Sequence, residues 1–91
     1  ATPSDPVLAR GQEIHQTRCA ACHGIRGQGG TGKKLNDGLI LQNRPTVEDH
    51  RAVVTEGLKG TAMVPFKDSL TPADIDAVVR YQREVLAKIA E

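Results

Sequence analysis

The apolar positions of the chain repeat with helical spacing toward its C-terminus. Thr71 and Asp74 form a capping box around Pro72, and apolar side chains then recur at intervals of three and four residues. These apolar positions are Ile75, Val78, Val79, Val85, Leu86 and Ile89. The pattern predicts a long amphipathic helix over residues 71–89.

Two more helices are predicted from capping signals. Asp5 can cap a helix that begins at Pro6 and runs into Cys19, since proline suits the first helical position. In the middle of the chain, Thr46 precedes an acidic first turn and an apolar stripe that ends near Gly57. Helices are therefore expected over residues 5–19 and 46–57.

Residues 24–38 separate the first two helices and contain six of the nine glycines. They keep no apolar periodicity, which predicts a loop. A linker between two domains is the alternative, but the segments on either side are too short to fold separately. No stretch alternates like a half-buried strand, so we expect a single all-α domain over residues 1–91.

The composition leaves little material for a core. The apolar fraction is 38%, and the aromatic residues are Phe66 and Tyr81 alone. Small domains commonly need a cross-link, a metal or a cofactor to be stable, so a bound apolar group is favoured. The net charge is +1 with both signs mixed along the chain, which gives no footprint for nucleic acid or an anionic membrane.

The start of the chain bears on localisation. It begins with Ala1 rather than Met, and no run of about 18 apolar residues is present, so membrane insertion is not expected. We interpret the chain as an exported protein whose signal peptide has been removed, working in the periplasm. Two free thiols would tend to pair there unless other chemistry consumes them.

Residues 19–23 read Cys-Ala-Ala-Cys-His and carry the main chemical signal. Cysteines three apart lie on the same side of a helical turn, where both can add to neighbouring vinyl groups of one porphyrin. His23 follows directly and is then carried under the iron. The sequence predicts one haem c attached through Cys19 and Cys22, with His23 as the first axial ligand.

Two other sites could use the cysteine pair. A zinc site would combine it with two of His15, His23 and His50, but such sites usually have a second, distant pair of closely spaced ligands. A thioredoxin-like dithiol needs a βαβ setting, which the pattern does not show. Both are disfavoured.

Haem iron prefers six ligands, and Met63 is the predicted sixth. It is the single methionine and lies in a Gly- and Pro-punctuated loop, residues 57–66, between two predicted helices. Core packing is the alternative role for this side chain. His50 is expected to be a solvated or capping histidine and His15 a helix-interface residue, so both are weaker ligand candidates.

The segment Cys19-Ala20-Ala21-Cys22-His23-Gly24, the loop methionine and the final helix resemble the class I cytochrome c family. The resemblance spans nearly the whole chain. It implies a cytochrome c fold of three to five helices around one haem, with the first and last helices crossing at Gly11 and Tyr81 packed at the crossing.

Three positions depart from the family pattern. His15 stands where the family usually has an aromatic residue, and could lend a weak pH response. Lys33 replaces the proline whose carbonyl accepts the proximal imidazole N–H, although a backbone carbonyl remains available. Pro65 is displaced by one position from the family's Met-Pro-x-Phe, which alters the path of the loop.

With both axial positions filled, the iron has no room for a substrate. We therefore expect a soluble one-electron carrier, not an enzyme, that exchanges electrons with an oxidase, reductase or dehydrogenase as a monomer or a subunit. One alternative is the haem subunit of a larger dehydrogenase complex. The other is an open-site haem enzyme or gas sensor, which would require Met63 to be displaced.

Lysines in the two loops suggest how a partner would dock. They are expected to border the haem and to guide it onto an acidic surface, whereas the simpler interpretation is ordinary solvated lysine. These residues are Lys33, Lys34, Lys59 and Lys67.

Overall fold

Helices joined by loops make up the computed structural model, which describes residues 2–91 and contains no strand among them. Ala1 lies outside the described residues. The elements in chain order are α1 (Pro6–Ile14), the π-helical turn η1 (His15–Cys19), α2 (Ala20–His23), α3 (Leu39–Asn43), α4 (Val47–Glu56), α5 (Pro72–Glu84) and the 3₁₀ turn η2 (Leu86–Lys88). The predicted all-α class is confirmed.

The predicted helix starts are also confirmed. Asp5, Thr46 and Thr71 each accept a hydrogen bond from a backbone N–H in the first turn of α1, α4 and α5. Such caps satisfy N–H groups that have no partner inside a helix. None of the helices in residues 2–91 is long and apolar enough to cross a membrane.

The structure differs from the sequence prediction at three places. The first helix does reach Cys19, but as a π turn, and then continues through α2 to His23. The short helix α3 was not predicted, because its N-cap is Gly38 and no side chain caps it. The last α-helix ends at Glu84, and not at Ile89.

The early end of α5 has a tertiary cause. The backbone N–H of Gly38 donates to the Ala87 carbonyl at 2.7 Å, and that of Asp37 donates to the Ile89 carbonyl at 2.8 Å. These bonds turn the tail toward the loop that precedes α3. The apolar periodicity continues through Leu86, which is buried, but the helix does not.

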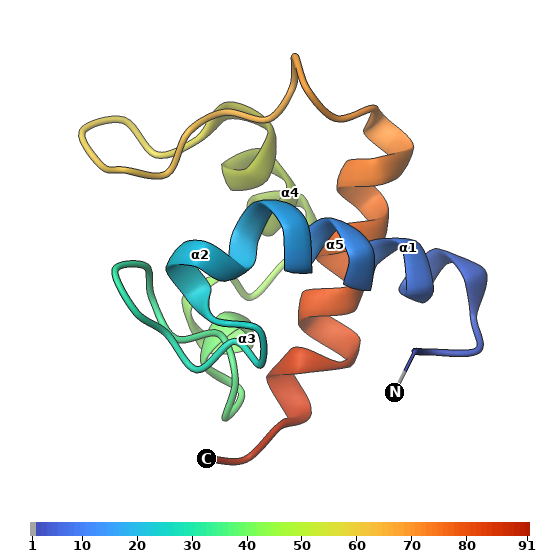
Figure 1. The fold of residues 1–91 in the computed structure, drawn as a ribbon. Helices are drawn as coiled ribbons and strands as arrows, with labels where there is room; N and C mark the ends of the chain where they lie inside the picture. The colour runs from blue at the N-terminus through green and yellow to red at the C-terminus, as the bar shows by residue number, and fades with distance from the viewer. Residues whose placement is uncertain (1) are drawn as a thin grey trace.

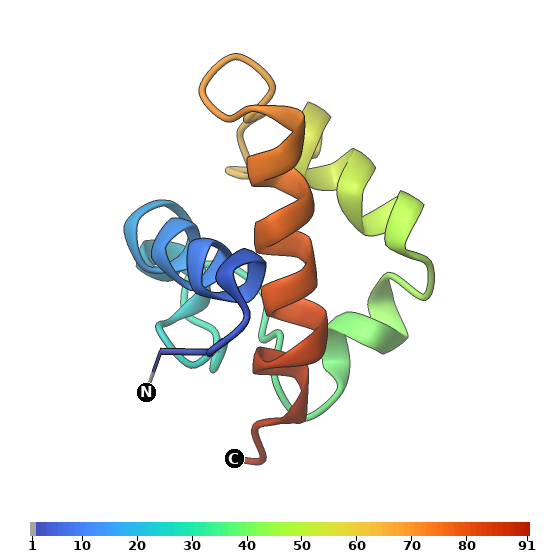
Figure 2. The same cartoon turned by 90° about the vertical axis from the view of Figure 1, so that its right-hand side faces the viewer.

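Helix α1 crosses α5 near its middle, as Figures 1 and 2 show. The crossing occurs at Gly11, where an added Cβ would lie 2.2 Å from the Ala77 carbonyl oxygen and 2.6 Å from Tyr81 Cβ. The absence of a side chain therefore allows the two backbones to approach closely. The crossing at Gly11 beside Tyr81, which the family resemblance implied, is confirmed.

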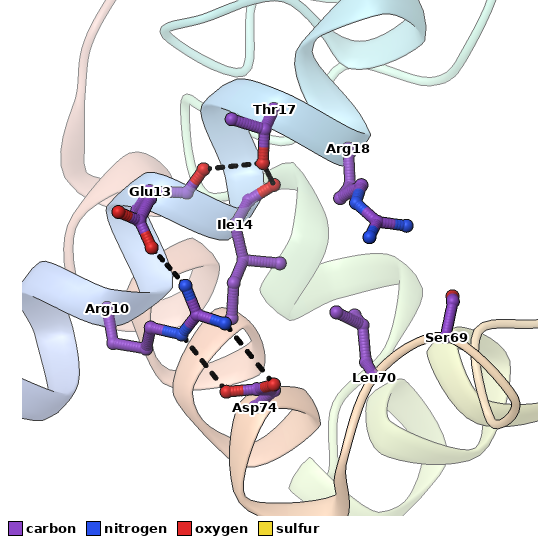
Figure 3. A pocket seen from close by; sticks show the side chains of 8 residues that line it. All are labelled: Arg10, Glu13, Ile14, Thr17, Arg18, Ser69, Leu70 and Asp74. Carbon is purple, nitrogen blue, oxygen red and sulfur yellow. Dashed lines mark hydrogen bonds and ion pairs between the residues drawn. The ribbon is translucent and has the colours of Figure 1, made fainter.

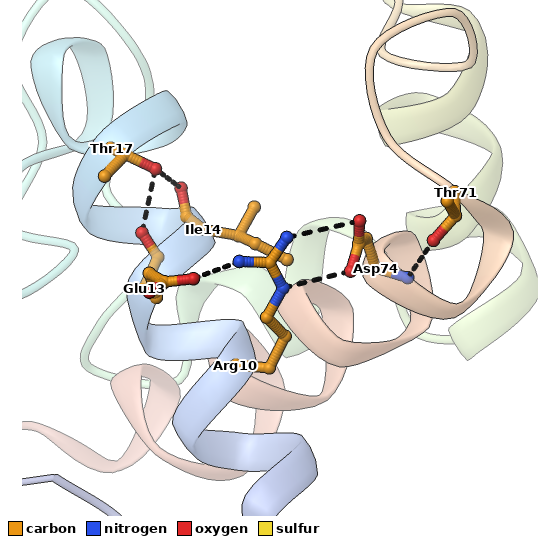
Figure 4. Close-up of polar contacts among 6 residues, drawn as sticks. All are labelled: Arg10, Glu13, Ile14, Thr17, Thr71 and Asp74. Atoms are coloured by element: carbon orange, nitrogen blue, oxygen red, sulfur yellow. Dashed lines mark hydrogen bonds and ion pairs between the residues drawn. The ribbon is translucent and has the colours of Figure 1, made fainter.

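Two ion pairs connect the crossing helices on their outer sides. Arg10 Nε lies 3.1 Å from an Asp74 oxygen, and Arg80 Nη2 lies 3.3 Å from Asp5. Figure 4 shows the guanidinium of Arg10 reaching both carboxylate oxygens of Asp74, whose backbone N–H is capped by Thr71. Both pairs are solvent-exposed, so water and salt screen them and their contribution to stability is small.

The core lies on the inner side of this crossing. One apolar cluster joins α1, η1, α4 and α5, and Met63 and Phe66 pack against it. Its buried members are Ile14, Cys19, Val54, Leu70, Ile75, Val78 and Val79. The predicted attachment residue Cys19 is therefore part of the same apolar cluster against which the predicted ligand Met63 packs.

Candidate haem site

Both cysteines are free thiols in the structure. Cys19 ends η1 and is buried, whereas Cys22 lies in α2 and is exposed. Burial raises the pKa of the Cys19 thiol to about 11, so this group stays protonated at neutral pH. A protonated thiol is a poor nucleophile, so Cys19 is not poised for disulfide exchange.

His23 is oriented by the backbone of the following loop. Its Nδ1 lies 2.7 Å from the Lys33 carbonyl oxygen, which can only accept, so Nδ1 carries the hydrogen. The other ring nitrogen, Nε2, makes no hydrogen bond with residues 2–91, so it is available to bind a metal. The replacement of proline by Lys33 has thus kept the carbonyl acceptor.

Gly32 makes this approach possible. A Cβ added there would lie 2.9 Å from His23 Cε1, closer than real Cβ contacts come, and 3.1 Å from Cys22 Cβ, which is also tight. The Gly32 N–H also donates to the Cys22 carbonyl at 2.8 Å. The glycine therefore lets the loop lie directly against the imidazole.

The C-terminal tail holds this loop from the other side. Glu91 forms an ion pair with Arg26 at 2.6 Å and accepts a hydrogen bond from Asn36 Nδ2, also at 2.6 Å. Asn36 is buried and donates as well to the Arg26 carbonyl at 3.1 Å. The segment that supports His23 is thereby fixed at both of its ends.

Met63 is held in the loop that connects α4 to α5. The Leu58 N–H donates to the Met63 carbonyl at 3.0 Å, and the Met63 N–H donates to Thr61 Oγ1 at 3.2 Å. Gly57, with a φ of 73°, packs so closely that an added Cβ would lie 2.6 Å from the Met63 oxygen. Figure 1 shows this loop and the loop after His23 on either side of α2.

The donor set fits a haem and not a zinc ion. Within residues 2–91 no group of three His, Cys, Asp or Glu side chains could hold a metal ion. Two free thiols and one oriented imidazole fit a covalently bound haem, and the thioether of Met63 beside the same apolar cluster is available as a further ligand. A polar pocket of about 250 Å³ beside Arg10 and Asp74 lies elsewhere (Figure 3), and its lining contains none of Cys19, Cys22, His23 and Met63.

The expectation that His50 is solvated or capping was wrong. Its side chain is 2% exposed, and its Nε2 lies 2.8 Å from Gln82 Oε1. The partner stands 32 residues away in α5, so local sequence gave no sign of it. His15 is a helix-interface residue as predicted, fully buried with its ring centroid 5.9 Å from that of Tyr81.

Burial also acts on the titration of the histidines. It lowers the pKa of His15, and it lowers the pKa of His50 to about 4, with the nearby Arg83 and Arg44 cations acting in the same direction. Both imidazoles are therefore neutral near pH 7. The lowered pKa of His15 shifts any pH response of this residue below the range near pH 6.5 that an ordinary histidine covers.

The buried His50 should make stability depend on pH. The unfolded state, with a pKa near 6.5, binds a proton that the folded state excludes, so stability falls as the pH drops from about 6.5 to 4, by up to about 3 kcal/mol. Urea unfolding across this range measures the loss. His50→Gln, whose amide N–H₂ can take the place of Nε2 as a donor toward Gln82 but does not titrate, should show a flatter profile; equal slopes would refute the assignment.

Two of the four loop lysines are paired with carboxylates. Lys34 Nζ lies 2.7 Å from Asp37, and Lys67 Nζ lies 3.0 Å from Glu56. Lys33 has no ion pair among residues 2–91, and neither has Lys59. The basic border expected from the sequence is therefore partly neutralised.

Sequence reasoning missed Gln82 altogether. This side chain is 4% exposed, and its amide forms hydrogen bonds with both buried histidines, His15 and His50. A usable signal was present, because Gln82 continues the helical spacing of Ile75 and Val78 on the buried face of α5. A polar residue at a core position needs partners, which is how it could have been found.

The fold and this arrangement of residues define a c-type cytochrome domain. The chain belongs to the family described as cytochrome c oxidase, cbb3-type, subunit III, whose family model matches residues 6–81.

Relatives of different sizes share this domain. Cytochrome c55X of Paracoccus denitrificans is 33% identical over 84 residues, which are 89% of this chain and 80% of that protein. The cbb3-type cytochrome c oxidase subunit FixP of Azorhizobium caulinodans is 33% identical over 87 residues, but the match spans only 28% of its length.

A solved structure of a c-type cytochrome, NirC, is similar over almost its whole length. It is 28% identical, with a TM-score of 0.72, and the match covers 93% of this chain and 99% of that one. The cytochrome c fold expected from the sequence is confirmed, and a domain of this size also occurs as a small cytochrome.

Proposed function

We propose that the domain carries single electrons on one haem c, attached through Cys19 and Cys22, with His23 and Met63 as axial ligands. The observation that supports this most directly is the His23 Nδ1–H bond to the Lys33 carbonyl at 2.7 Å. It orients the imidazole and leaves the second ring nitrogen available to bind iron. The packing of Met63 on the cluster that contains Cys19 supports the sixth ligand.

Each residue has a distinct part in this proposal. The bound haem iron supplies the Fe(II)/Fe(III) couple. His23 becomes a stronger donor because its N–H is hydrogen-bonded to a carbonyl. The thioether of Met63 is soft and uncharged, which favours Fe(II) and raises the potential relative to a second imidazole. The apolar cluster around Ile14 and Val54 keeps water away from Cys19 and Met63.

A carrier agrees better with these residues than an enzyme does. An open-site haem enzyme needs a base or donor free to act above the iron. His50 was the one residue that could be considered, and its Nε2 is engaged with Gln82. We propose a periplasmic protein that exchanges electrons with a redox partner of the oxidase, reductase or dehydrogenase class.

Covalent attachment is tested by mass. After expression with haem-attaching machinery and acid-acetone extraction, the intact mass should exceed that of the chain by one haem, and reductive titration should consume one electron per chain. The double variant Cys19→Ala, Cys22→Ala should lose the added mass completely, because no thiol remains. Met63→Ala is the matched control and should keep it. An unmodified mass for the natural chain would refute the proposal.

A second candidate is the haem domain or subunit of a larger redox complex. The family description and the length of FixP, of which this chain matches 28%, favour it. Size-exclusion chromatography of the protein from its native source separates the two functions. A free carrier elutes alone, whereas a subunit elutes with its partner.

A further inference from the structure

A buried chain of hydrogen bonds runs from α4 through α5 to η1. Gln82 lies at its centre, where Nε2 is 3.1 Å from His15 Nδ1 and Oε1 is 2.8 Å from His50 Nε2. The three side chains are between 0% and 4% exposed. Buried polar groups of this kind act as one network, because each bond polarises the next.

The two ends of the chain fix the direction of every bond. At one end, His15 Nε2 lies 2.8 Å from the Gly24 carbonyl oxygen, which can only accept. At the other end, Arg83 Nη1 lies 3.5 Å from His50 Nδ1 and 2.6 Å from the Arg44 carbonyl, and a guanidinium can only donate. Each imidazole must therefore carry its single hydrogen on Nε2.

This arrangement has no place for an added proton. A proton on His15 Nδ1 would face the amide N–H₂ of Gln82. If that amide rotated, its N–H₂ group would face the Nε2–H of His50 instead. Moving the His50 hydrogen to Nδ1 would direct it at Arg83. Every alternative leaves two donors facing each other in the interior, which costs several kcal/mol.

The groups around the two rings reinforce their neutrality. His15 faces the Tyr81 ring of α5, and His50 lies near the cations Arg83 and Arg44. No carboxylate among residues 2–91 stabilises an imidazolium at either ring. Burial lowers the pKa of both histidines, and the cations lower that of His50 further.

This network of hydrogen bonds also contacts the haem-attachment segment. His15 bonds the carbonyl of Gly24, which directly follows His23. We propose that Gln82 is a positioning residue that keeps His15 and His50 in one neutral tautomer beside the haem, so that electron transfer is not coupled to proton uptake. The inference rests on the proposed haem attachment at Cys19.

Gln82→Glu tests this role in the holoprotein. A carboxylate can only accept, so His15 Nδ1 must bind a proton to face it, and a titrating pair is created beside the haem. The potential, measured at an electrode from pH 5 to 8, should gain a pH dependence. Relative to the natural protein, the redox equilibrium constant should change by at least threefold and up to tenfold per pH unit, since one proton per electron gives tenfold.

Gln42→Glu is the matched control. It introduces the same charge at an exposed position of α3, and its profile should run parallel to that of the natural protein. Titration of the haem carboxylates is common to all three proteins and cancels in the comparison. If the Gln82→Glu profile also runs parallel, the proposal is overturned.

A second measurement needs no variant. Nitrogen-15 NMR of the reduced natural holoprotein should show His15 and His50 as neutral imidazoles with the hydrogen on Nε2 throughout pH 5–8. A hydrogen on Nδ1, or an imidazolium, at either residue would overturn the proposal. Intact mass is recorded on every sample, so a failure of haem attachment is distinguished from a failure of this inference.

Discussion

Gly11→Ala is expected to destabilise the domain by about 3 kcal/mol or more, because overpacking against backbone is not relieved by a side-chain rotation. The new methyl group would lie 2.2 Å from the Ala77 carbonyl oxygen and 2.6 Å from Tyr81 Cβ. Helix α1 must then move away from α5. At an ordinary helical site, replacing glycine with alanine has the opposite effect and raises stability by up to about 1 kcal/mol.

Guanidinium unfolding of the holoprotein measures this effect. Ala52→Gly is the matched control, since Ala52 is exposed on α4 and the change reports helix propensity alone. It should cost about 1 kcal/mol. If Gly11→Ala proved as stable as the natural protein, the close approach of the two helices would not be the constraint that the structure indicates.

Met63→Ala is expected to abolish the weak far-red sulfur-to-iron charge-transfer band of the oxidised protein. Met63 is the single methionine, so no other thioether can replace it. The potential should fall by at least about 0.1 V, a fraction of the roughly 0.8 V that axial ligands span. Optical spectra and redox titration of the two holoproteins check both effects.

Val64→Ala is the control for this substitution. Val64 is the next residue of the same loop and is 56% exposed, so its truncation should leave the band unchanged. Persistence of the band in Met63→Ala, or its absence from the natural protein, would remove Met63 as the ligand. A high-spin natural protein would then favour an open site, and a low-spin one a second histidine.

The helix starts were predictable because their signals are local. Asp5, Thr46 and Thr71 accept bonds from N–H groups two or three residues away, and such spacing can be seen in a sequence. The end of α5 was not predictable. It depends on hydrogen bonds to the tail from the N–H groups of Asp37 and Gly38, which are distant from it in sequence.

The site also contains features that local sequence predicts and features that it does not. The spacing of residues 19–23 predicts haem attachment, whereas the environment of His50 is set by α5, which no local pattern indicates. Gln82 is polar at a position where periodicity calls for an apolar residue, and its meaning emerges only when both histidines are seen beside it. Buried polar networks are specified by pairs distant in sequence, so apolar periodicity can mark Gln82 as a buried polar position but does not identify its partners.

The contacts that pack the helices together differ from the contacts that hold the loop of Met63, the proposed sulfur ligand. Helices α1 and α5 pack through Gly11 and a shared apolar cluster, but the Met63 backbone is fixed mainly by short-range bonds to Leu58 and Thr61. Segments with few buried contacts open at a lower free energy than the global transition. With Met63 as the proposed ligand, release of the thioether would need only a subglobal opening of this loop, while the packing of α1 on α5 at Gly11 stays intact.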